Sequence, residues 1–381
     1  MNTFVSTSLG VLLLMLVAYD VYTTILDDRP RVGPISDTLN RAVWYAGRAF
    51  ASRLSRARRH HFLNVLGPLL LPSLLILYIG FVMVGFAFIY FPHMHHKFSV
   101  SPGAAGAPWF DSFYYSGVTL TTVGYGDIAP VARSMRIAAL VESASGIALI
   151  SLAITYLIAV YQALERKRTV ALSFYHQADE GANVGNFIAH HFVDGRFYGV
   201  IDVIRPAARD LHGLLESHIE HPIIHFFHPV QVYKSLPRIL FLMLETSAVL
   251  RVCLDPERYP ETCKHPEVRT LESSARHVLG QFVAALGLGG RARHGGAERF
   301  EESSRWRKRY EQTMRRLRES GIETRADEAA GWEEYRAKRE EWESPLKRLA
   351  DYLGYDWDEV TGDGDLRHAA AEPAEEPGAS D

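Results

Sequence analysis

The chain has very little cysteine and almost no net charge. Only two of its 381 residues are cysteine, Cys253 and Cys263, which excludes the multi-disulfide framework of small secreted domains. The paired-cysteine spacings of zinc sites are absent as well. The 41 basic and 44 acidic residues leave a formal net charge of −3. This balance creates no general attraction to nucleic acid, and we expect no nucleic-acid partner.

Regulatory and catalytic motifs are also missing. No G-x-G-x-x-G follows a predicted strand, and the glycine group at residues 287–290 follows a predicted helix with the wrong spacing. We therefore expect no organic cofactor. No apolar run carries an arginine at every third position, so strong voltage sensing is not expected. A catalytic triad, a phosphate-binding loop and a closed metal site are absent, and we expect no enzymatic activity.

Three long apolar runs are present, all before Glu165. They are Leu9–Ile25, Leu63–Phe91 and Ile137–Tyr161, each long enough to cross a bilayer as a helix. Asp20 interrupts the first run near its end, where we interpret it as an interfacial or helix-packing acid. Most charged residues follow Glu165, which predicts a membrane part followed by a soluble part.

Basic residues predict the orientation of the spans. Between the second and third runs, up to Pro130, the only basic residue is Lys97. Eight arginines lie between the first and second runs: Arg29, Arg31, Arg41, Arg48, Arg53, Arg56, Arg58 and Arg59. Short loops rich in Lys and Arg stay cytoplasmic. We therefore expect a multi-pass plasma membrane protein with its amino terminus outside and the basic linker inside, in contact with membrane lipids. Everything after Arg166 is expected to be cytoplasmic.

The segment between the second and third runs is too short to cross the membrane. Residues 109–120 are aromatic and apolar, with Asp111 and Ser112 at the start, where such side chains can cap a helix. We predict a re-entrant helix followed by an extended, glycine-rich strand, residues 121–127. Irregular backbone at membrane depth is tolerated only where protein or a water-filled path surrounds it.

This strand has the composition needed to strip water from a cation. Carbonyl groups turned toward one axis can replace the hydration shell of an ion, and Gly124 and Gly126 permit the backbone angles that this requires. Val123 and Tyr125 are expected to point away and to wedge the strand against the short helix. The carboxyl end of that helix carries partial negative charge, which favours a cation.

These residues resemble the potassium channel family. Residues 122–127, Thr-Val-Gly-Tyr-Gly-Asp, match its filter sequence without a substitution, and residues 113–121 look like its pore helix. The pattern from Glu142 to Gly146 looks like the inner helix of prokaryotic members, which implies the bacterial inner membrane. The resemblance covers residues 63–165.

The resemblance implies an all-α membrane protein with a tetrameric potassium-channel pore domain. That domain comprises an outer helix (63–91), a pore helix (109–120), a filter (121–127) and an inner helix (133–165), preceded by an extra span (1–27) and a cytoplasmic basic linker (28–62). One strand cannot enclose an ion, so four chains must meet as a homotetramer. The filter residues that bind K⁺ would be Thr122, Val123, Gly124, Tyr125 and Gly126, supported by Thr121, Asp127 and Glu142.

Two inner-helix residues have alternative interpretations. Gly146 is either a gating hinge or a packing notch. Glu142 lies one turn above it, and it either supports the filter through hydrogen bonds or lies near the outer interface.

The cytoplasmic part, residues 166–360, is predicted to be helical. Its predicted helices are 184–203, 207–219, 222–228, 237–254, 268–287, 297–319 and 327–354. The run 237–254 contains Glu245 and Arg251 and is expected to be a buried core helix instead of a fourth span. The tail, 361–381, has the composition of a disordered segment.

Four histidines in this part recur at helical spacing: His218, His221, His225 and His228. Two or three imidazoles on one face could bind zinc or nickel. Alternatively, they are partly buried residues that hydrogen-bond to backbone, or a protonation switch near neutral pH.

The predicted function is passive, selective conduction of K⁺, gated by the cytoplasmic domain through an unknown ligand. The alternatives are a potassium uptake transporter, which would join four pore loops in one chain, and a membrane-anchored sensor with a structural pore domain.

Overall fold

The computed structural model describes residues 2–27, 32–101, 103, 106–177, 183–290 and 296–362. Its contacts divide the chain into two compact units. The membrane unit comprises residues 1–163 and 218–228, and the helical unit comprises residues 164–217 and 229–381. The first change of unit, after residue 163, lies close to the predicted end of the pore domain. The return of residues 218–228 to the membrane unit was not predicted.

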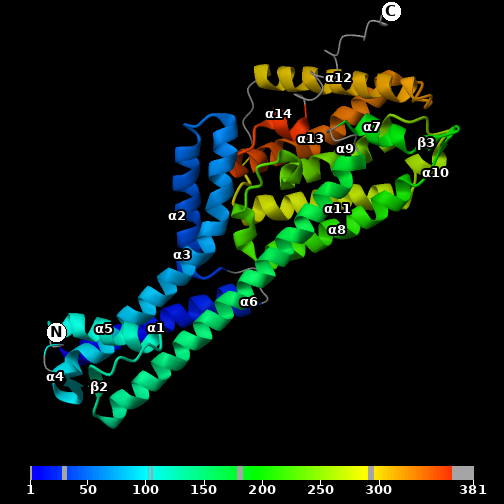
Figure 1. Cartoon of the computed structure of the whole chain (residues 1–381). Coiled ribbons are helices and arrows are strands. Elements are labelled where there is room, and N and C mark those ends of the chain that lie inside the picture. Colours follow the sequence, from blue (N-terminus) through cyan, green and yellow to red (C-terminus); the bar gives the residue numbers. More distant parts are fainter. Residues whose placement is uncertain are drawn as a thin grey trace, which may run out of the picture. The chain divides into compact units, whose positions relative to one another are not determined.

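The membrane unit is built from helices and one small sheet (Figure 1). In chain order its elements are α1 (Thr3–Val21), a π-helical turn (Tyr22–Leu26), α2 (Pro34–Ala51), α3 (Arg56–Tyr90), a 3₁₀ turn (Phe91–His93), α4 (Met94–Lys97), β1 (Phe98–Val100), α5 (Pro108–Leu120), β2 (Ile128–Pro130) and α6 (Arg133–Gln177). Strands β1 and β2 pair antiparallel, with Ser99 opposite Ala129.

Three helical stretches of the described residues are long and apolar enough to cross a membrane: Thr3–Leu26, Arg56–Lys97 and Arg133–Leu172. They contain the three predicted spans. The outer and inner helices are longer than predicted, because polar residues at the start of α3 and the end of α6 continue the helix beyond the apolar run.

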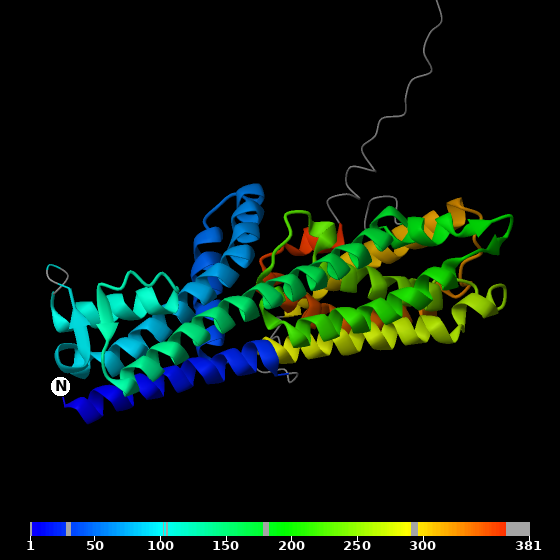
Figure 2. The same cartoon turned by 60° about the horizontal axis from the view of Figure 1, so that its bottom comes forward.

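The basic linker predicted at 28–62 is largely helical. It contains α2 and the start of α3, and α2 lies beside the first half of α3 in both views (Figures 1 and 2). Phe50 of α2 packs against Phe62 of α3 with ring centroids 5.1 Å apart. Gly47 faces Leu66 so closely that a Cβ atom at position 47 would overlap the leucine side chain.

Helix α1 packs on α3 through small residues. A Cβ atom on Gly10 would overlap the carbonyl oxygen of Gly85, and the hydroxyl of Ser6 donates a 2.7 Å hydrogen bond to the carbonyl of Phe88. Close approach through glycine is typical of helix pairs in membranes. The extra first span therefore belongs to the same packed unit as the outer helix.

The helical unit is organised around one buried helix, α9 (Leu236–Val252). Nearly every residue of α9 is buried, which confirms the prediction of a core helix at 237–254. Its neighbours are α7 (Val184–His190), α10 (Pro260–Cys263), α11 (Pro266–Ala285), α13 (Glu328–Leu353) and α14 (Trp357–Thr361), while α12 (Gly296–Glu319) packs on α7 and α13.

Two of the three charged residues in α9, Glu245 and Arg251, are paired inside the unit. Glu245 accepts a 3.2 Å hydrogen bond from the guanidinium of Arg339, and Arg251 pairs with Glu272. Since a buried charge needs a partner, these pairs explain how the core tolerates both residues.

The prediction of a helix at 184–203 is wrong for the middle of that range. After α7 the chain forms a hairpin of β3 (Phe192–Val193) and β4 (Arg196–Phe197), and α8 runs from Val200 to Glu220. Asp194 and Gly195 have φ angles of 50° and 79°, which a helix does not allow and a two-residue hairpin turn requires. Of the predicted tail, residues 363–381 lie outside the described residues.

Candidate ion pathway

Helix α5 leads directly into residues 121–127, and we keep the names pore helix and filter for these two predicted elements. It begins at Pro108, one residue before the predicted start, and ends at Leu120 as predicted. Its first residue is a proline, whose missing N–H has no intrahelical partner to lose. Neither Asp111 nor Ser112 is the N-cap, which is Ala107. Asp111 lies in the first turn and accepts a 3.1 Å hydrogen bond from the backbone N–H of Gly106, while Ser112 donates to the carbonyl of Pro108.

The filter backbone is not a regular strand. Positive φ angles occur at alternate residues, 60° at Thr122, 59° at Gly124 and 80° at Gly126. A β-strand turns successive carbonyls to opposite sides, whereas an alternation of left-handed and right-handed residues turns them to the same side. Thr122 holds a conformation that is uncommon outside glycine, as residues at functional sites often do.

The side chains of Val123 and Tyr125 are largely exposed in the single chain. Val123 is 52% exposed and Tyr125 is 71% exposed, so neither is buried against the chain's own pore helix, and the predicted wedge stays a prediction. In contrast, Thr121 is tied to that helix, because its hydroxyl donates a 2.6 Å hydrogen bond to the carbonyl of Gly117. The backbone N–H of Val123 donates to the carbonyl of Val118 at 3.0 Å.

Asp127 anchors the outer end of the filter. Its carboxylate accepts a 2.9 Å hydrogen bond from the hydroxyl of Tyr114 on the pore helix. Its carbonyl accepts a 2.8 Å hydrogen bond from the backbone N–H of Ser101, which follows β1. The predicted supporting role of Asp127 therefore has a geometric basis in two neighbouring elements.

Glu142 joins the three helices behind the filter. Its side chain is fully buried, and its carboxylate accepts hydrogen bonds from the hydroxyls of Tyr90 on α3, at 2.8 Å, and of Ser116 on α5. Of the two interpretations of this residue, the geometry favours support of the filter and not a place at the outer interface.

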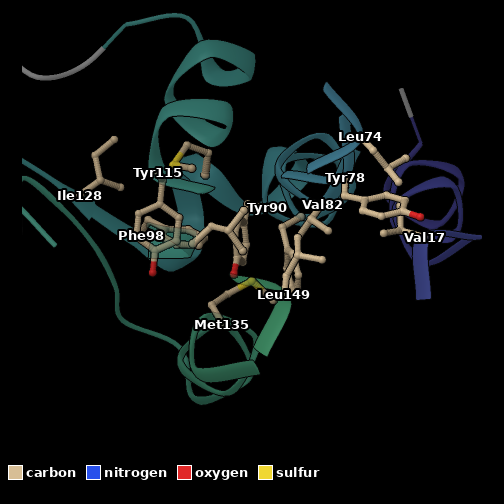
Figure 3. Close-up of a cluster of buried hydrophobic side chains, with 13 residues drawn as sticks. Val17, Leu74, Tyr78, Val82, Tyr90, Phe98, Tyr115, Ile128, Met135 and Leu149 are labelled. Carbon is tan, nitrogen blue, oxygen red and sulfur yellow. The ribbon is translucent and has the colours of Figure 1, made fainter. Parts of the chain in front are cut away.

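An aromatic cluster surrounds this carboxylate. The rings of Tyr90, Phe98 and Tyr115 meet edge to face with centroid separations of 5.0–5.5 Å (Figure 3). Met135 and Leu149 of α6 contribute to the same buried cluster. The pore helix, the outer helix and the first turns of the inner helix are thus packed as one body.

Gly146 lies where α6 passes the end of the pore helix. A Cβ atom on Gly146 would overlap the carbonyl oxygen of Leu120, and α6 is continuous through this position. This close contact indicates that Gly146 acts as a packing notch, in which the missing side chain makes room for the neighbouring helix. The gating hinge stays a prediction.

Asp20 has a role that the spacing of apolar residues did not reveal. Its buried carboxylate accepts hydrogen bonds from the backbone N–H groups of Ile35, at 2.6 Å, and Ser36, at 3.2 Å, in the first turn of α2. It also accepts from the hydroxyls of Ser36 and of Tyr78 on α3, at 2.5 and 2.6 Å. Since the N-cap Gly33 has no side chain, Asp20 takes over the capping of α2. The sequence signal that could have predicted this cap is an acid, Asp20, followed by a helix start at Gly33-Pro34 that has no capping side chain of its own.

The four predicted histidine ligands do not converge. His228 hydrogen-bonds to His60 with 2.7 Å between ring nitrogens, whereas His218 and His225 form a separate pair with ring centroids 5.2 Å apart. His221 contacts Tyr156. Among the described residues, no three His, Cys, Asp or Glu side chains form a group that could hold a metal ion.

Comparisons with known proteins identify the pore segment. The sequence model of an ion channel family matches residues 74–163, which include α5, the filter and most of α6. The uncharacterised membrane protein YdjJ of Bacillus subtilis is 28% identical over 271 residues, 71% of this chain and 76% of that protein. The comparison with solved structures gives no significant match.

Two shorter matches cover smaller parts of the chain. Protein LctB of Geobacillus stearothermophilus is 42% identical over 64 residues, 15% of this chain and 48% of that protein. The human potassium voltage-gated channel subfamily A member 7 is 34% identical over 77 residues, 20% of this chain and 15% of that protein. Together with the three candidate spans, these matches support an all-α membrane protein with an ion channel pore domain. A match to this family also suggests that the protein is not an enzyme.

Proposed function

We propose that the protein is a potassium-selective channel that conducts K⁺ passively, with residues 122–126 of four chains enclosing the ions. The observation that carries this proposal is the alternation of positive φ angles within Thr-Val-Gly-Tyr-Gly. It gives this strand the backbone needed to direct consecutive carbonyls, which replace the hydration shell of K⁺, toward one axis. One matched relative is itself named a potassium channel.

The exposure of Val123 and Tyr125 supports the tetramer. Both are large side chains beside the proposed pore, and both remain largely exposed in a single chain. A fourfold arrangement supplies neighbouring subunits for them and closes the pore. We further propose that the protein lies in the bacterial inner membrane, with the helical unit in the cytoplasm, where it gates conduction in response to an unidentified ligand.

The test is K⁺ flux into liposomes that contain the purified full-length protein, compared with Na⁺ flux. Gly124→Asp should abolish the flux, because it places a charged side chain on a residue with a φ of 59°. Gly195→Asp is the matched control. It has a φ of 79° and open space around it, but it lies in the β3–β4 turn of the helical unit.

A second test measures K⁺ binding instead of flux, so it also works if the channel is closed. A ligand that binds only the folded state raises the melting temperature, so K⁺ should protect the tetramer from heat better than Na⁺ does. Gly124→Asp should remove that difference and Gly195→Asp should keep it. A well-folded wild-type protein with neither K⁺-selective flux nor K⁺-specific protection would contradict the proposal and favour a membrane-anchored sensor.

A further inference from the structure

Residues 218–228, which we call the inserted segment, are the one part of the described residues after 163 that packs in the membrane unit. The chain enters the segment from the helical unit after Ser217 and returns to that unit at Pro229. Its buried side chains are His218, Ile223, Ile224, Phe226, Phe227 and His228. The segment is therefore connected through the chain to the helical unit at both of its ends.

The segment is held tightly against α3. The side-chain amide of Asn64 donates a 2.7 Å hydrogen bond to the carbonyl of His228, and the His228 ring bonds to His60. Gly67 provides the space for this approach. A Cβ atom there would lie 2.9 Å from the carbonyl oxygen of Phe226 and from the Cα of Phe227.

The segment also contacts α2 and the inner helix. Phe226 packs against Trp44 of α2 with ring centroids 5.6 Å apart. His221 meets the ring of Tyr156 edge to face at 5.5 Å, and Phe227 meets Tyr161 at 6.5 Å. It thus bridges the cytoplasmic half of α6 to the α2–α3 pair.

Tyr156, one of the two contacted residues of α6, lies on the buried face of that helix, whereas Tyr161 is 47% exposed. Glu142, Leu149, Tyr156 and Val160 follow one another at helical spacing and are all buried. Near the filter this face packs on α3 and α5, and further along it lies against the inserted segment. Ile147, Ile154 and Ile158 are exposed on the other side.

We propose that the inserted segment is an autoinhibitory wedge. This inference rests on the proposed function and adds that the four α6 helices of the tetramer line the pore. Widening such a pore moves the cytoplasmic halves of these helices away from the axis, toward the face that carries Tyr156 and Val160. The segment occupies that space, so it opposes opening while it is docked. Displacement of the helical unit withdraws it and allows α6 to move.

The test uses a substitution that expels the segment without touching the filter. In Gly67→Leu, the new side chain meets backbone atoms of residues 226 and 227, which must move. Gly80→Leu is the matched control. It places the same residue in the same helix, where a Cβ atom meets nothing within 4 Å.

We expect Gly67→Leu to raise the initial K⁺ flux into liposomes at least about fivefold, the lower end of typical coupling between two sites. Gly80→Leu should leave the flux at the wild-type level. Addition of Gly124→Asp to Gly67→Leu should abolish the increase, which shows that the ions pass through the filter. An unchanged or lower flux in Gly67→Leu that still elutes as the wild-type oligomer would overturn the inference.

A second variant decides the matter if Gly67→Leu does not fold. Phe226→Ala removes the contact with Trp44 and introduces no clash, so it too should raise the flux; Phe4→Ala, at a side chain that is 77% exposed, is its control. A folded Phe226→Ala without increased flux would overturn the inference. If K⁺-specific thermal protection persists in that case, the inference alone fails. If the protection is also absent, the proposed function fails with it.

Discussion

The hydroxyl of Tyr114 donates a 2.9 Å hydrogen bond to the carboxylate of Asp127, thirteen residues later in the chain. It is the side-chain link between the pore helix and the outer end of the filter. Because the bond fixes Asp127 relative to a rigid helix, it should stabilise the conducting arrangement of the filter.

Tyr114→Phe should therefore lower K⁺ flux by about two- to tenfold, the range for the net effect of one hydrogen bond. Liposome flux at fixed K⁺ gradient measures this, with Tyr19→Phe, an exposed tyrosine of α1, as the control. Equal flux in the two variants would show that the bond does not support conduction.

Glu142 should contribute to the stability of the membrane unit. Glu142→Gln replaces one acceptor oxygen with an NH₂ donor that faces the hydroxyl of Tyr90 or Ser116. An unsatisfied buried donor costs about 1–3 kcal/mol, and we expect a lower melting temperature in detergent. Glu165→Gln, at an exposed position of the same helix, should melt like the wild type. A melting temperature of Glu142→Gln equal to that of this control would contradict the expected role.

Asp20 should hold α1, α2 and α3 together. Asp20→Asn directs an amide NH₂ group at donors that the carboxylate now accepts, and we expect a loss of about 3 kcal/mol. The exposed Asp37 pairs only with Arg41 one turn along α2, so Asp37→Asn should cost less than about 1 kcal/mol. Denaturant unfolding in detergent compares the two, and similar losses would refute the structural role of Asp20.

Glu272 should make the helical unit sensitive to acid. Burial alone would raise the pKa of this carboxyl, but its hydrogen bond to Lys338 and the charge of Arg251 lower the pKa below its ordinary value of 4.5. A group whose pKa is lowered by folding stabilises the protein above its unfolded pKa. That contribution is lost as the pH falls through the lowered value.

Glu272→Gln should consequently reduce the melting temperature at pH 7, and the difference from the wild type should shrink as the pH falls below about 4.5. Melting curves across this pH range test whether the stability difference shrinks as the pH falls. A difference that is constant with pH would mean that the ion pairs do not contribute through the charge of Glu272.

The membrane spans and the pore helix could be predicted because their signals are local. A bilayer demands a continuous apolar run, so the spans at residues 9–25, 63–91 and 137–161 were visible without any tertiary information. Helix ends were less predictable. Helix α3 begins at Arg56, before the apolar run, and α2 packs beside this part of α3 through the contact of Phe50 with Phe62.

The hairpin after α7 was missed for a related reason. Apolar residues at 184–203 fit a helical spacing, but the left-handed conformations of Asp194 and Gly195 interrupt it. Aromatic contacts of Phe192 and Phe197 with Tyr259 hold the hairpin in place, and Tyr259 is distant in the sequence.

The sequence by itself determined the class of protein, through an apolar pattern that selects the membrane. It also carries the proposed ion pathway, a Thr-Val-Gly-Tyr-Gly-Asp stretch whose glycines permit the required backbone. Both are properties of consecutive residues. Only the tertiary structure decided that Asp20 caps α2, that Glu142 joins three helices behind the filter, and that residues 218–228 pack against α3 and α6. Those roles depend on hydrogen bonds and ring contacts between residues 15 to 168 positions apart, and the local spacing of residues does not predict such pairs.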